Sequence, residues 1–300
     1  PKNVEYLYCD IRDYESVKRA LKDVDIVIHT AIIQIPKVNK EKKLGYEVNV
    51  LGTQNVCRVA DENSKIKGFV LAGSWHTIGE REIVGVVEET FGYRPDKVED
   101  RARLYVLSKI LQEGIVRFYD EVSEKVFGII RMGTVLGQRM PEKTAANMFI
   151  ERATKGLSIT PYKHSMYRPM LYVDVRDVCR AFTAFTSKIL NSEINKKGSS
   201  LYRIVNVVYP QPVTVVELAE IVREAIAALT MGKICPPIEI VDMKLPQLFS
   251  PDDKNKFTVD INRVVQFLGM EKLIPPRESI KHIIRRRLVH ARMPNLWDSP

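Results

Sequence analysis

The chain has 300 residues, of which 45% are hydrophobic and 28% are charged, and no apolar stretch approaches the roughly 20 residues of a membrane-spanning helix. This composition excludes a membrane span and a disordered chain. Only four cysteines occur, which excludes a disulfide framework and favours a reducing, cytoplasmic compartment, and they form no C-x-x-C pair. No secretory signal and no metal site are predicted.

Basic residues are in excess, with 46 Lys and Arg against 37 Asp and Glu, and the formal net charge is +9. Nucleic-acid binding would need these residues on one face with aromatic side chains between them, but they are dispersed along the chain. The densest run, at 285–287, falls in a predicted helix and is interpreted as a solvated face. The charge instead favours anionic small molecules such as phosphate esters.

Strand and helix patterns alternate through the first half of the chain. The predicted elements, in chain order, are a strand at 4–8, a helix at 14–21, a strand at 25–29, a helix at 46–62, a strand at 68–72, a helix at 101–119 and a strand at 126–131. The strands are short apolar runs of the kind that parallel sheets bury on both faces. The alternation predicts an α/β fold with a Rossmann-like, doubly wound parallel sheet.

The second half of the chain changes in character and predicts a smaller C-terminal lobe. Its elements, in chain order, are a helix at 145–155, a strand at 169–173, a helix from 174, a strand at 202–207, a helix at 214–229, a strand at 236–241 and helices at 260–268 and 278–289. Thr214 and Glu217 have the spacing of a capping box at the start of one helix.

Tyr105 and Lys109 form a pattern that carries chemistry, because a helix presents residues four apart on one face. A nearby cation favours the phenolate and lowers the pKa of a tyrosine from about 10 toward neutrality, as a tyrosine base requires. The spacing alone is weak evidence. Ser74 strengthens it, because this hydroxyl ends a buried strand and so lies at the carboxyl end of the sheet, where ligands bind in this architecture.

The chain resembles the extended short-chain dehydrogenase/reductase family, and specifically its nucleotide-sugar epimerase/dehydratase branch. The resemblance covers nearly the whole chain and rests on motifs in the family's order, at residues 10–13, 28–31, 48–56, 73–79, 105–109, 131–139 and 168–175. It implies an NAD(P)-dependent, UDP-sugar 4-epimerase-like oxidoreductase. It also implies a Rossmann-like NAD(P)-binding core at 1–137 plus 168–207, and a substrate-binding lobe at 138–167 plus 208–300.

The same resemblance implies a catalytic group made of Ser74, Tyr105 and Lys109. Tyr105 would exchange a proton with a sugar hydroxyl as hydride moves to or from the nicotinamide. Lys109 would lower the pKa of Tyr105 and hold the nicotinamide ribose. Ser74 would hydrogen-bond the reacting oxygen.

Binding residues are implied as well. The cofactor, NAD or NADP, would be bound by Asp10, Ile11, Ala31, Asn49, Tyr105 and Lys109, the first two at the adenine. The substrate would be bound by Ser74, His76, Arg139 and Arg168, the last at the diphosphate. Structural alternatives stay open for four of these residues: a turn residue for Asp10, a helix-interior residue that satisfies backbone groups for Asn49, a satisfied structural histidine for His76 and an ion-pair partner for Arg168.

Two features depart from the family pattern. No G-x-x-G-x-x-G or G-x-G-x-x-G turn occurs, and the family's first β-α-β unit, about 50 to 60 residues, has no counterpart. We interpret the chain as N-terminally shortened and expect it to bind NAD(P) weakly and to be essentially inactive. The strand at 4–8 would then pair with 25–29, join another subunit or detach. In addition, Trp75 and His76 replace the Asp-Glu pair of the dehydratases, which argues against that reaction.

Two other classes stay open. One is a hydroxysteroid dehydrogenase-like or reductase-like member of the same family, which shares the Tyr, Lys and Ser residues, and the other is a non-catalytic binding protein. Arg168 with its polar neighbours favours an anionic nucleotide-sugar substrate over a sterol. We expect neither nucleic acid nor a membrane as a partner, and a homodimer is left open.

Overall fold

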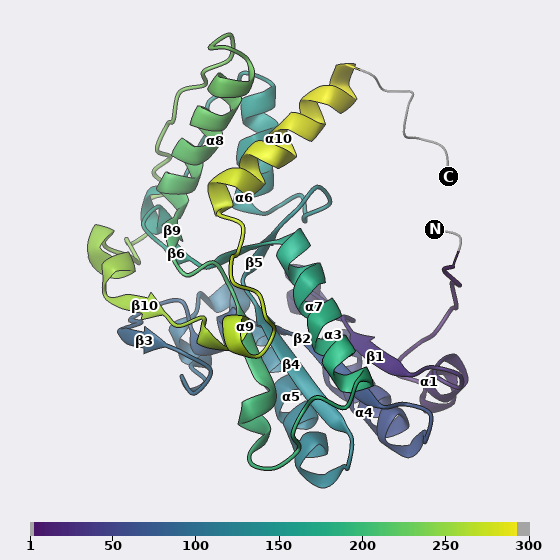
Figure 1. Cartoon of the computed structure of the whole chain (residues 1–300). Coiled ribbons are helices and arrows are strands. Elements are labelled where there is room, and N and C mark those ends of the chain that lie inside the picture. The colour runs from purple at the N-terminus through teal and green to yellow at the C-terminus, as the bar shows by residue number, and fades with distance from the viewer. Residues whose placement is uncertain (1–2, 293–300) are drawn as a thin grey trace.

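A parallel sheet of four strands forms the centre of the protein, whose computed structural model describes residues 3–292 (Figure 1). The strands lie in the order β1 (Ile26–His29), β2 (Gly68–Ser74), β4 (Val126–Met132) and β8 (Ile204–Val207). Every neighbouring pair is parallel. β2 is buried along its whole length, which explains its apolar sequence. The predicted α/β class with a parallel sheet is confirmed.

Helices cover both faces of this sheet. α4 (Thr53–Glu62) and α5 (Asp100–Val122) pack on one face, and α7 (Val175–Leu190) packs on the other, where it crosses in front of the strands in Figure 1. α1 (Tyr14–Ala20) packs against α4. The sheet lies between these two layers of helices. Because its strands are parallel, their carboxyl ends meet at one edge of the sheet.

Each face of the sheet has its own apolar core, because neighbouring residues of a strand point in opposite directions. In β2, Phe69 and Leu71 join the core beneath α4 and α5. Val70 and Ala72 join the core beneath α7. A strand with apolar residues at every position is therefore required here, and no polar side chain is available for chemistry until β2 ends at Ser74.

A second group of helices, α6 (Ala145–Thr154), α8 (Val215–Leu229) and α10 (Pro276–Arg292), packs together in the upper part of Figure 1. Its core also includes Trp75 and Ile78, so it is continuous with the turn that follows β2. The boundaries that we predicted between core and lobe stay a proposal, and residues 1–2 and 293–300 lie outside the described residues.

The capping box at the start of α8 is confirmed. The Thr214 hydroxyl accepts a hydrogen bond from the Glu217 N–H, and the Glu217 carboxylate accepts one from the Thr214 N–H. These bonds satisfy backbone donors that the first turn of a helix leaves free.

The remaining elements are short. Three two-stranded pairs are β3 (Gly85–Val87) with β10 (Phe257–Val259), β5 (Thr134–Leu136) with β7 (Tyr172–Asp174), and β6 (Pro169–Met170) with β9 (Val213–Thr214). The short α-helices are α2 (Lys37–Lys40), α3 (Lys42–Tyr46) and α9 (Asn262–Gln266). A π-helical turn covers Glu47–Gly52, and 3-10 turns cover Trp75–Ile78, Pro95–Lys97, Lys163–Ser165, Ser200–Arg203 and Pro251–Asn255.

The predicted strand at 4–8 is wrong. These residues belong to no strand, and the side chains of Tyr6 and Tyr8 are 86% and 96% exposed. A strand requires a backbone partner, and within the described residues β1 pairs only with β2. In the structure this segment is detached from the sheet, which is one of the three outcomes that we expected.

Other predicted elements need smaller corrections. The strand at 236–241 is replaced by isolated bridges to residues 159 and 162. The strand at 169–173 is divided into β6 and β7, which pair with different partners. The helix at 46–62 contains the π-helical turn, the strand at 202–207 starts only at Ile204, and the helix at 260–268 shortens to α9.

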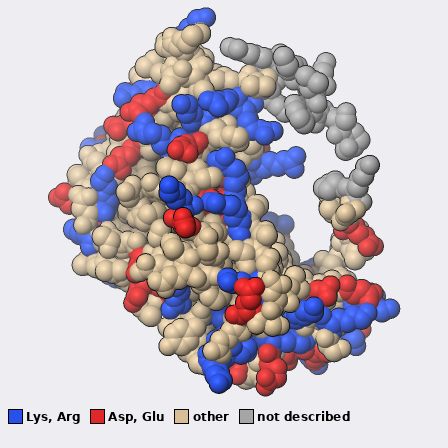
Figure 2. Space-filling model, in the orientation of Figure 1, with Lys and Arg blue, Asp and Glu red and all other residues tan. Residues whose placement is uncertain are grey.

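Basic and acidic side chains are interspersed over the face that Figure 2 shows, and basic ones gather over the upper part, where Figure 1 has α10. Arg285 and Arg286 of this helix are exposed, whereas Arg287 is half-buried and donates a hydrogen bond to Asn147. None of the helices in the described part of the chain is long and apolar enough to cross a membrane.

Candidate active site

Ser74 and Tyr105 meet where β2 ends and α5 passes over the sheet. Ser74 is the last residue of β2, and Tyr105 lies in the second turn of α5, which packs against both β2 and β4. The Ser74 side chain is close enough to Tyr105 to stabilise its phenolate by hydrogen bonding. The two side chains are therefore neighbours, and the convergence of their hydroxyls on one substrate oxygen stays a prediction.

Lys109 lies one turn further along α5 and is 4% exposed. Its Nζ donates a hydrogen bond of 2.8 Å to the carbonyl of Ala72, in the strand that carries Ser74. Burial lowers the pKa of Lys109 to about 7, and the negative charge of Glu113 opposes this shift. Lys109 is therefore poised to change its charge near neutral pH.

The sequence predicted that Lys109 lowers the pKa of Tyr105, and the structure does not show this effect. Desolvation raises the pKa of Tyr105 above its usual value, and only the interaction with Ser74 acts in the opposite direction. One N–H of the Lys109 side chain donates to the Ala72 carbonyl. Lys109 thus does not lower the pKa of Tyr105 in this structure, and its role beside the phenol and the cofactor stays a prediction.

His76 stands between Ser74 and a buried carboxylate. Its Nδ1 lies 3.2 Å from the Ser74 Oγ, and its Nε2 lies 3.2 Å from the Glu80 Oε1. Its ring also meets that of Tyr105 edge to face, with centroids 6.3 Å apart. The sequence singled out His76 but missed Glu80, although a carboxylate four residues after a histidine was a visible signal.

Glu80 is 3% exposed. Burial alone would raise the pKa of its carboxyl, but the hydrogen bond and the charge of His76, followed by the charge of Arg168, outweigh it and lower the pKa to about 2. Glu80 is therefore a carboxylate throughout the physiological range.

Arg168 pairs with two carboxylates. Its guanidinium binds the Glu99 carboxylate and lies 3.8 Å from the Glu80 Oε2. This contact is the ion-pair alternative that the sequence left open, and the diphosphate role of Arg168 stays a proposal. Arg139, the other arginine assigned to the substrate, is exposed just after β5.

Asn49 is fully buried and holds the loop after β1. Its side chain accepts a hydrogen bond from the Ile33 N–H at 2.6 Å and donates to the Ile33 carbonyl at 3.1 Å and to the Ser108 hydroxyl at 3.0 Å. This is the structural alternative for Asn49. Any cofactor contact would be made by the loop that it holds, which includes Ala31.

A buried polar group lies beside Ala31. The Gln112 Nε2 donates hydrogen bonds to the Thr53 Oγ1 at 2.8 Å and to the Ala31 carbonyl at 3.4 Å. The Gln112 Oε1 has no hydrogen-bond partner among the described residues. A buried acceptor without a partner is rare in folded proteins, and it fits a ligand that brings a hydroxyl or amide donor.

Asp10 and Ile11, predicted at the adenine, have intramolecular partners. The Asp10 carboxylate accepts hydrogen bonds from the backbone and guanidinium of Arg12, which lower the pKa of Asp10 to about 2. Ile11 packs so closely on Gly52 that a Cβ at residue 52 would lie 2.6 Å from its side chain. Asp10 is thus a turn residue, and its adenine contact stays a proposal.

The donor set at this edge of the sheet fits a nicotinamide nucleotide. Ser74 and Tyr105 supply hydroxyls, Lys109 an amine, and Gln112 an unpartnered acceptor. These groups suit a ribose and a carboxamide, which carry both donors and acceptors.

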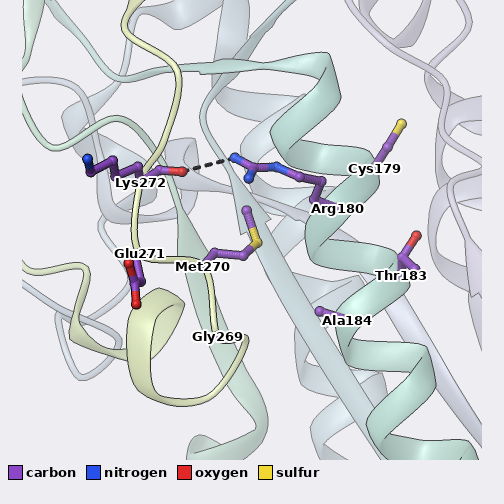
Figure 3. Close-up of a pocket in the computed structure, with 8 residues that line it drawn as sticks. All are labelled: Cys179, Arg180, Thr183, Ala184, Gly269, Met270, Glu271 and Lys272. Carbon is purple, nitrogen blue, oxygen red and sulfur yellow. Dashed lines mark hydrogen bonds between the residues drawn. The ribbon is translucent and has the colours of Figure 1, made fainter.

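A different hollow lies between α7 and the loop after α9, with a volume of about 720 Å³ (Figure 3). Arg180 crosses it to donate a 2.9 Å hydrogen bond to the Lys272 carbonyl and also pairs with Asp177. Its lining includes none of the predicted site residues. We therefore centre the candidate site on Ser74 and Tyr105.

The parallel sheet and its helices on both faces define a Rossmann-like protein. The chain belongs to the NAD dependent epimerase/dehydratase family, whose sequence profile matches residues 1–198. This match confirms the family that the motifs indicated.

Two curated relatives differ in the activity that their names give. Cinnamoyl-CoA reductase 1 of Petunia hybrida is 29% identical over 177 residues, which are 57% of this chain and 50% of the relative. UDP-glucuronate 4-epimerase 5 of Arabidopsis thaliana is 27% identical over 193 residues, which are 63% of this chain and 43% of the relative. The chain thus spans about half the length of the curated relatives that it matches.

A solved structure has the same fold. The UDP-glucose 4-epimerase of Thermus thermophilus, in complex with NAD, has a TM-score of 0.71 and 24% sequence identity. The alignment covers 95% of this chain and 85% of that one. The likeness establishes the Rossmann-like fold for nearly the whole chain.

Proposed function

We propose that this protein is an NAD(P)-dependent oxidoreductase of the epimerase type and that its substrate is a nucleotide sugar, in particular a UDP-sugar. The observation that carries the proposal is the approach of Ser74 to Tyr105 at the carboxyl edge of the sheet, with Lys109 buried one helical turn away. Membership of the epimerase/dehydratase family and relatives named as UDP-sugar 4-epimerases support it.

The residues divide the chemistry among them. A bound NAD(P) would supply the hydride chemistry at the sugar carbon. Tyr105 removes the proton of the hydroxyl on that carbon and later gives it back, while Ser74 hydrogen-bonds the reacting oxygen. Lys109 and Gln112 hold the ribose and carboxamide side of the cofactor.

The substrate's diphosphate would be held by arginine. Arg168 already forms ion pairs with Glu99 and Glu80. It must therefore exchange a carboxylate partner for a phosphate oxygen when the substrate binds. Arg139 is exposed and meets no such competition in the contacts described above. We propose that Arg139 contacts the diphosphate first, as the substrate arrives, and that Arg168 holds it once the substrate is bound.

Incubation with NAD⁺ at about 1 mM and either UDP-glucose or UDP-glucuronate tests the proposal, because this concentration detects even weak cofactor binding. We expect the epimer at the sugar C4 to appear on chromatography only slowly, in keeping with the weak NAD(P) binding and low activity that the sequence predicts for this chain. A protein shown by calorimetry to be saturated with NAD⁺ that converts neither sugar contradicts the proposal. The weak NAD(P) binding expected from the sequence is measured in the same titration.

Reduction of an acyl-CoA or carbonyl substrate is a second candidate. It is favoured by the relative named cinnamoyl-CoA reductase 1, which is 29% identical to this chain. The two candidates differ in stoichiometry, since a reductase consumes NAD(P)H while an epimerase regenerates its cofactor. Loss of NAD(P)H absorbance with a hydroxycinnamoyl-CoA, and no sugar epimerisation, would favour the reductase.

A homodimer is proposed from the exposed side of α5. Apolar side chains recur there at spacings of three, four and seven residues and remain between 37% and 64% exposed, at Leu104, Leu107, Leu111, Phe118 and Val122. This is the spacing of a helix-packing seam. A contiguous exposed stripe of this kind marks an interaction surface, and the same stripe on a second copy is self-complementary across a two-fold axis.

A further inference from the structure

The helix α10 packs on α6 and α8 and has two different faces. Its buried face is apolar and joins the core of this group of helices through Ile280, Ile283 and Ile284. Near the start of the helix, the Ser279 hydroxyl donates a 2.7 Å hydrogen bond to the buried Asp174 carboxylate. The fold therefore fixes which side of α10 remains at the surface.

The outer face of α10 is basic. Lys281 and Arg285 lie four residues apart and so share one side of the helix, and Arg286 lies beside them. All three side chains are exposed. Arg277 of the same helix pairs with Glu224, but Lys281, Arg285 and Arg286 have no carboxylate partner within the described part of the chain.

The positive charge on this side of the molecule is concentrated. α10 contains six Lys and Arg and a single acidic residue, Glu278, and Figure 2 shows basic side chains gathered where Figure 1 has this helix. Burial lowers the pKa of His282, and the charges of Arg176, Arg286 and Arg285 lower it further. Cations that lie this close together repel one another, and an anionic partner would remove the repulsion.

Compensation of the helix dipole does not explain the row of cations. That effect is confined to the last turn of a helix. α10 ends at Arg292, so Arg285 lies about two turns and Lys281 about three turns before its end. The outer face is therefore available to an external anion.

The shape of the face favours an extended anionic surface. A small anion needs donors that converge on it, whereas these cations lie along the outside of a helix, and the hollow beside α7 includes none of them. Single-stranded nucleic acid needs aromatic side chains between the cations. Residues 281–289 contain no Phe, Tyr or Trp.

Apolar residues accompany the cations at the end of the helix. Val289 lies one turn beyond Arg285 on the same side and is 52% exposed. The sequence continues after α10 with Met293, Leu296 and Trp297. Basic residues next to aliphatic and aromatic ones are typical of segments that bind at the membrane–water interface, because charge and apolar contact act together there.

We propose that the outer face of α10, formed by Lys281, Arg285, Arg286 and Val289, binds a membrane surface that contains anionic phospholipids. The cations pair with the lipid headgroups, and Val289 and the apolar residues after the helix contact the interface. This peripheral binding needs no membrane span. As a proposal, it replaces the expectation that a membrane is not a partner and that the basic run is only a solvated face. It does not depend on the proposed function.

Sedimentation with lipid vesicles tests the proposal on the whole chain, without cofactor or substrate. At about 0.1 M NaCl we expect binding to phosphatidylcholine vesicles that contain about 30% phosphatidylserine, and none to phosphatidylcholine alone. Binding should fall at about 0.5 M NaCl, because salt screens the attraction. Equal binding to both kinds of vesicle, or binding to neither, would overturn the proposal.

A double variant locates the binding on α10. Arg285→Gln with Arg286→Gln should weaken binding to the anionic vesicles about 30-fold, since each basic residue near such a surface contributes roughly a factor of five. Both side chains are exposed, so urea unfolding should be unchanged. Arg19→Gln with Lys22→Gln is the matched control, which removes the same charge from exposed residues in and just after α1. An equal loss in both double variants would contradict the proposal.

Tryptophan fluorescence tests the apolar contact. The chain has two tryptophans, and Trp75 is 2% exposed in the core. Anionic vesicles should shift the emission to shorter wavelength as the Trp297 indole enters the interface, and Trp297→Phe should abolish the shift. Sedimentation without this shift would contradict the proposed contact.

Double-stranded nucleic acid is the other polyanion that suits a basic helix. A DNA duplex of about 20 base pairs, titrated at the same salt concentration, separates the two partners. We expect the anionic vesicles to bind and the duplex not to bind. Binding of the duplex without binding of the vesicles would make the face a nucleic-acid surface and the proposal wrong.

Discussion

Individual side chains at the end of β2 are arranged by contacts that the strand itself cannot make. Ser74 is the first polar side chain after a buried apolar run, and it receives Tyr105 from α5 and His76 from the turn that follows. One hydroxyl thus joins two elements that are distant in sequence. We therefore expect the chemistry of the site to depend on this serine as well as on the tyrosine.

Removal of the phenolic hydroxyl is the direct test of Tyr105. In a version of the protein that carries the family's glycine-rich segment, Tyr105→Phe should lower turnover with a UDP-sugar at least 100-fold, roughly the low end for losing general acid-base catalysis. Tyr202→Phe, which removes a hydroxyl from a tyrosine that is 62% exposed, should have no effect. Steady-state kinetics measure both. Equal rates for the two variants would remove Tyr105 from the mechanism.

His29, buried at the end of β1, should make stability depend on pH. Its Nε2 lies 2.9 Å from the Thr53 hydroxyl, and burial, helped by the positive charge of Lys109, lowers its pKa to about 4. Between this value and the ordinary value near 6.5, only the unfolded chain binds a proton at His29. The free energy of unfolding should therefore fall as the pH drops through this window, by up to about 1.4 kcal/mol per pH unit.

The variant His29→Phe keeps an aromatic ring beside Phe69, with which His29 packs at 5.8 Å, but cannot titrate. Urea unfolding between about pH 7 and pH 4 should show a flatter loss of stability for this variant than for the parent protein. Parallel curves for the two proteins would mean that His29 is not the group responsible.

At the scale of elements, the close packing of α7 on the sheet depends on a residue without a side chain. A Cβ at Gly128, in β4, would lie 2.2 Å from the ring of Phe185, which is fully buried in α7. The ring cannot move away without opening the core beneath α7. The approach of this helix therefore requires glycine at that position.

Gly128→Ala should destabilise the fold by about 1 to 3 kcal/mol, the usual cost of overpacking a buried site. Gly114→Ala is the matched control, because a Cβ at Gly114 meets nothing within 4 Å and the residue lies inside α5. That change should stabilise the helix by roughly 0.5 to 1 kcal/mol. Denaturant unfolding of the two variants should give shifts of opposite sign.

Local patterns predicted the elements that are stabilised by their own residues. β2 was predicted from a run of consecutive apolar residues, and α5 was predicted from the helical spacing of its apolar residues. The strand at 4–8 was not formed, because strand pairing is made with another segment and no described strand offers it a partner. The segment at 169–173 was divided because the Leu171 carbonyl accepts from Thr134 between two separate pairings.

The same distinction applies to the site. The spacing of Tyr105 and Lys109 predicted that they share one face of a helix. It could not predict the hydrogen bond from Lys109 to Ala72, because these two residues lie 37 positions apart in the sequence. Likewise, the ion pair of Arg168 with Glu99 spans 69 residues. Contacts between distant segments set the protonation of these groups, so the charges of the site could not be predicted from spacing.

At the scale of the whole molecule, the site lies between two cores. The apolar core that joins α6, α8 and α10 extends to Trp75 and Ile78, in the turn directly after Ser74. Packing in the C-terminal half therefore fixes the same turn that presents His76. A substrate-binding lobe in this position would be coupled to the catalytic turn through shared packing rather than through a flexible connection.

The stripe on α5 leads to the last prediction, that two copies associate through this helix. Burying leucine at such a seam is favourable, whereas a carboxylate there would have to be desolvated without a partner. Leu111→Glu, at the middle of the stripe and 46% exposed, should convert a dimer to a monomer. Leu190→Glu, at the end of α7 and 42% exposed, lies outside the stripe and should leave the dimer intact. Light scattering coupled to gel filtration measures the mass of each variant, and a parent protein of 34.4 kDa that already elutes as a monomer would contradict the prediction.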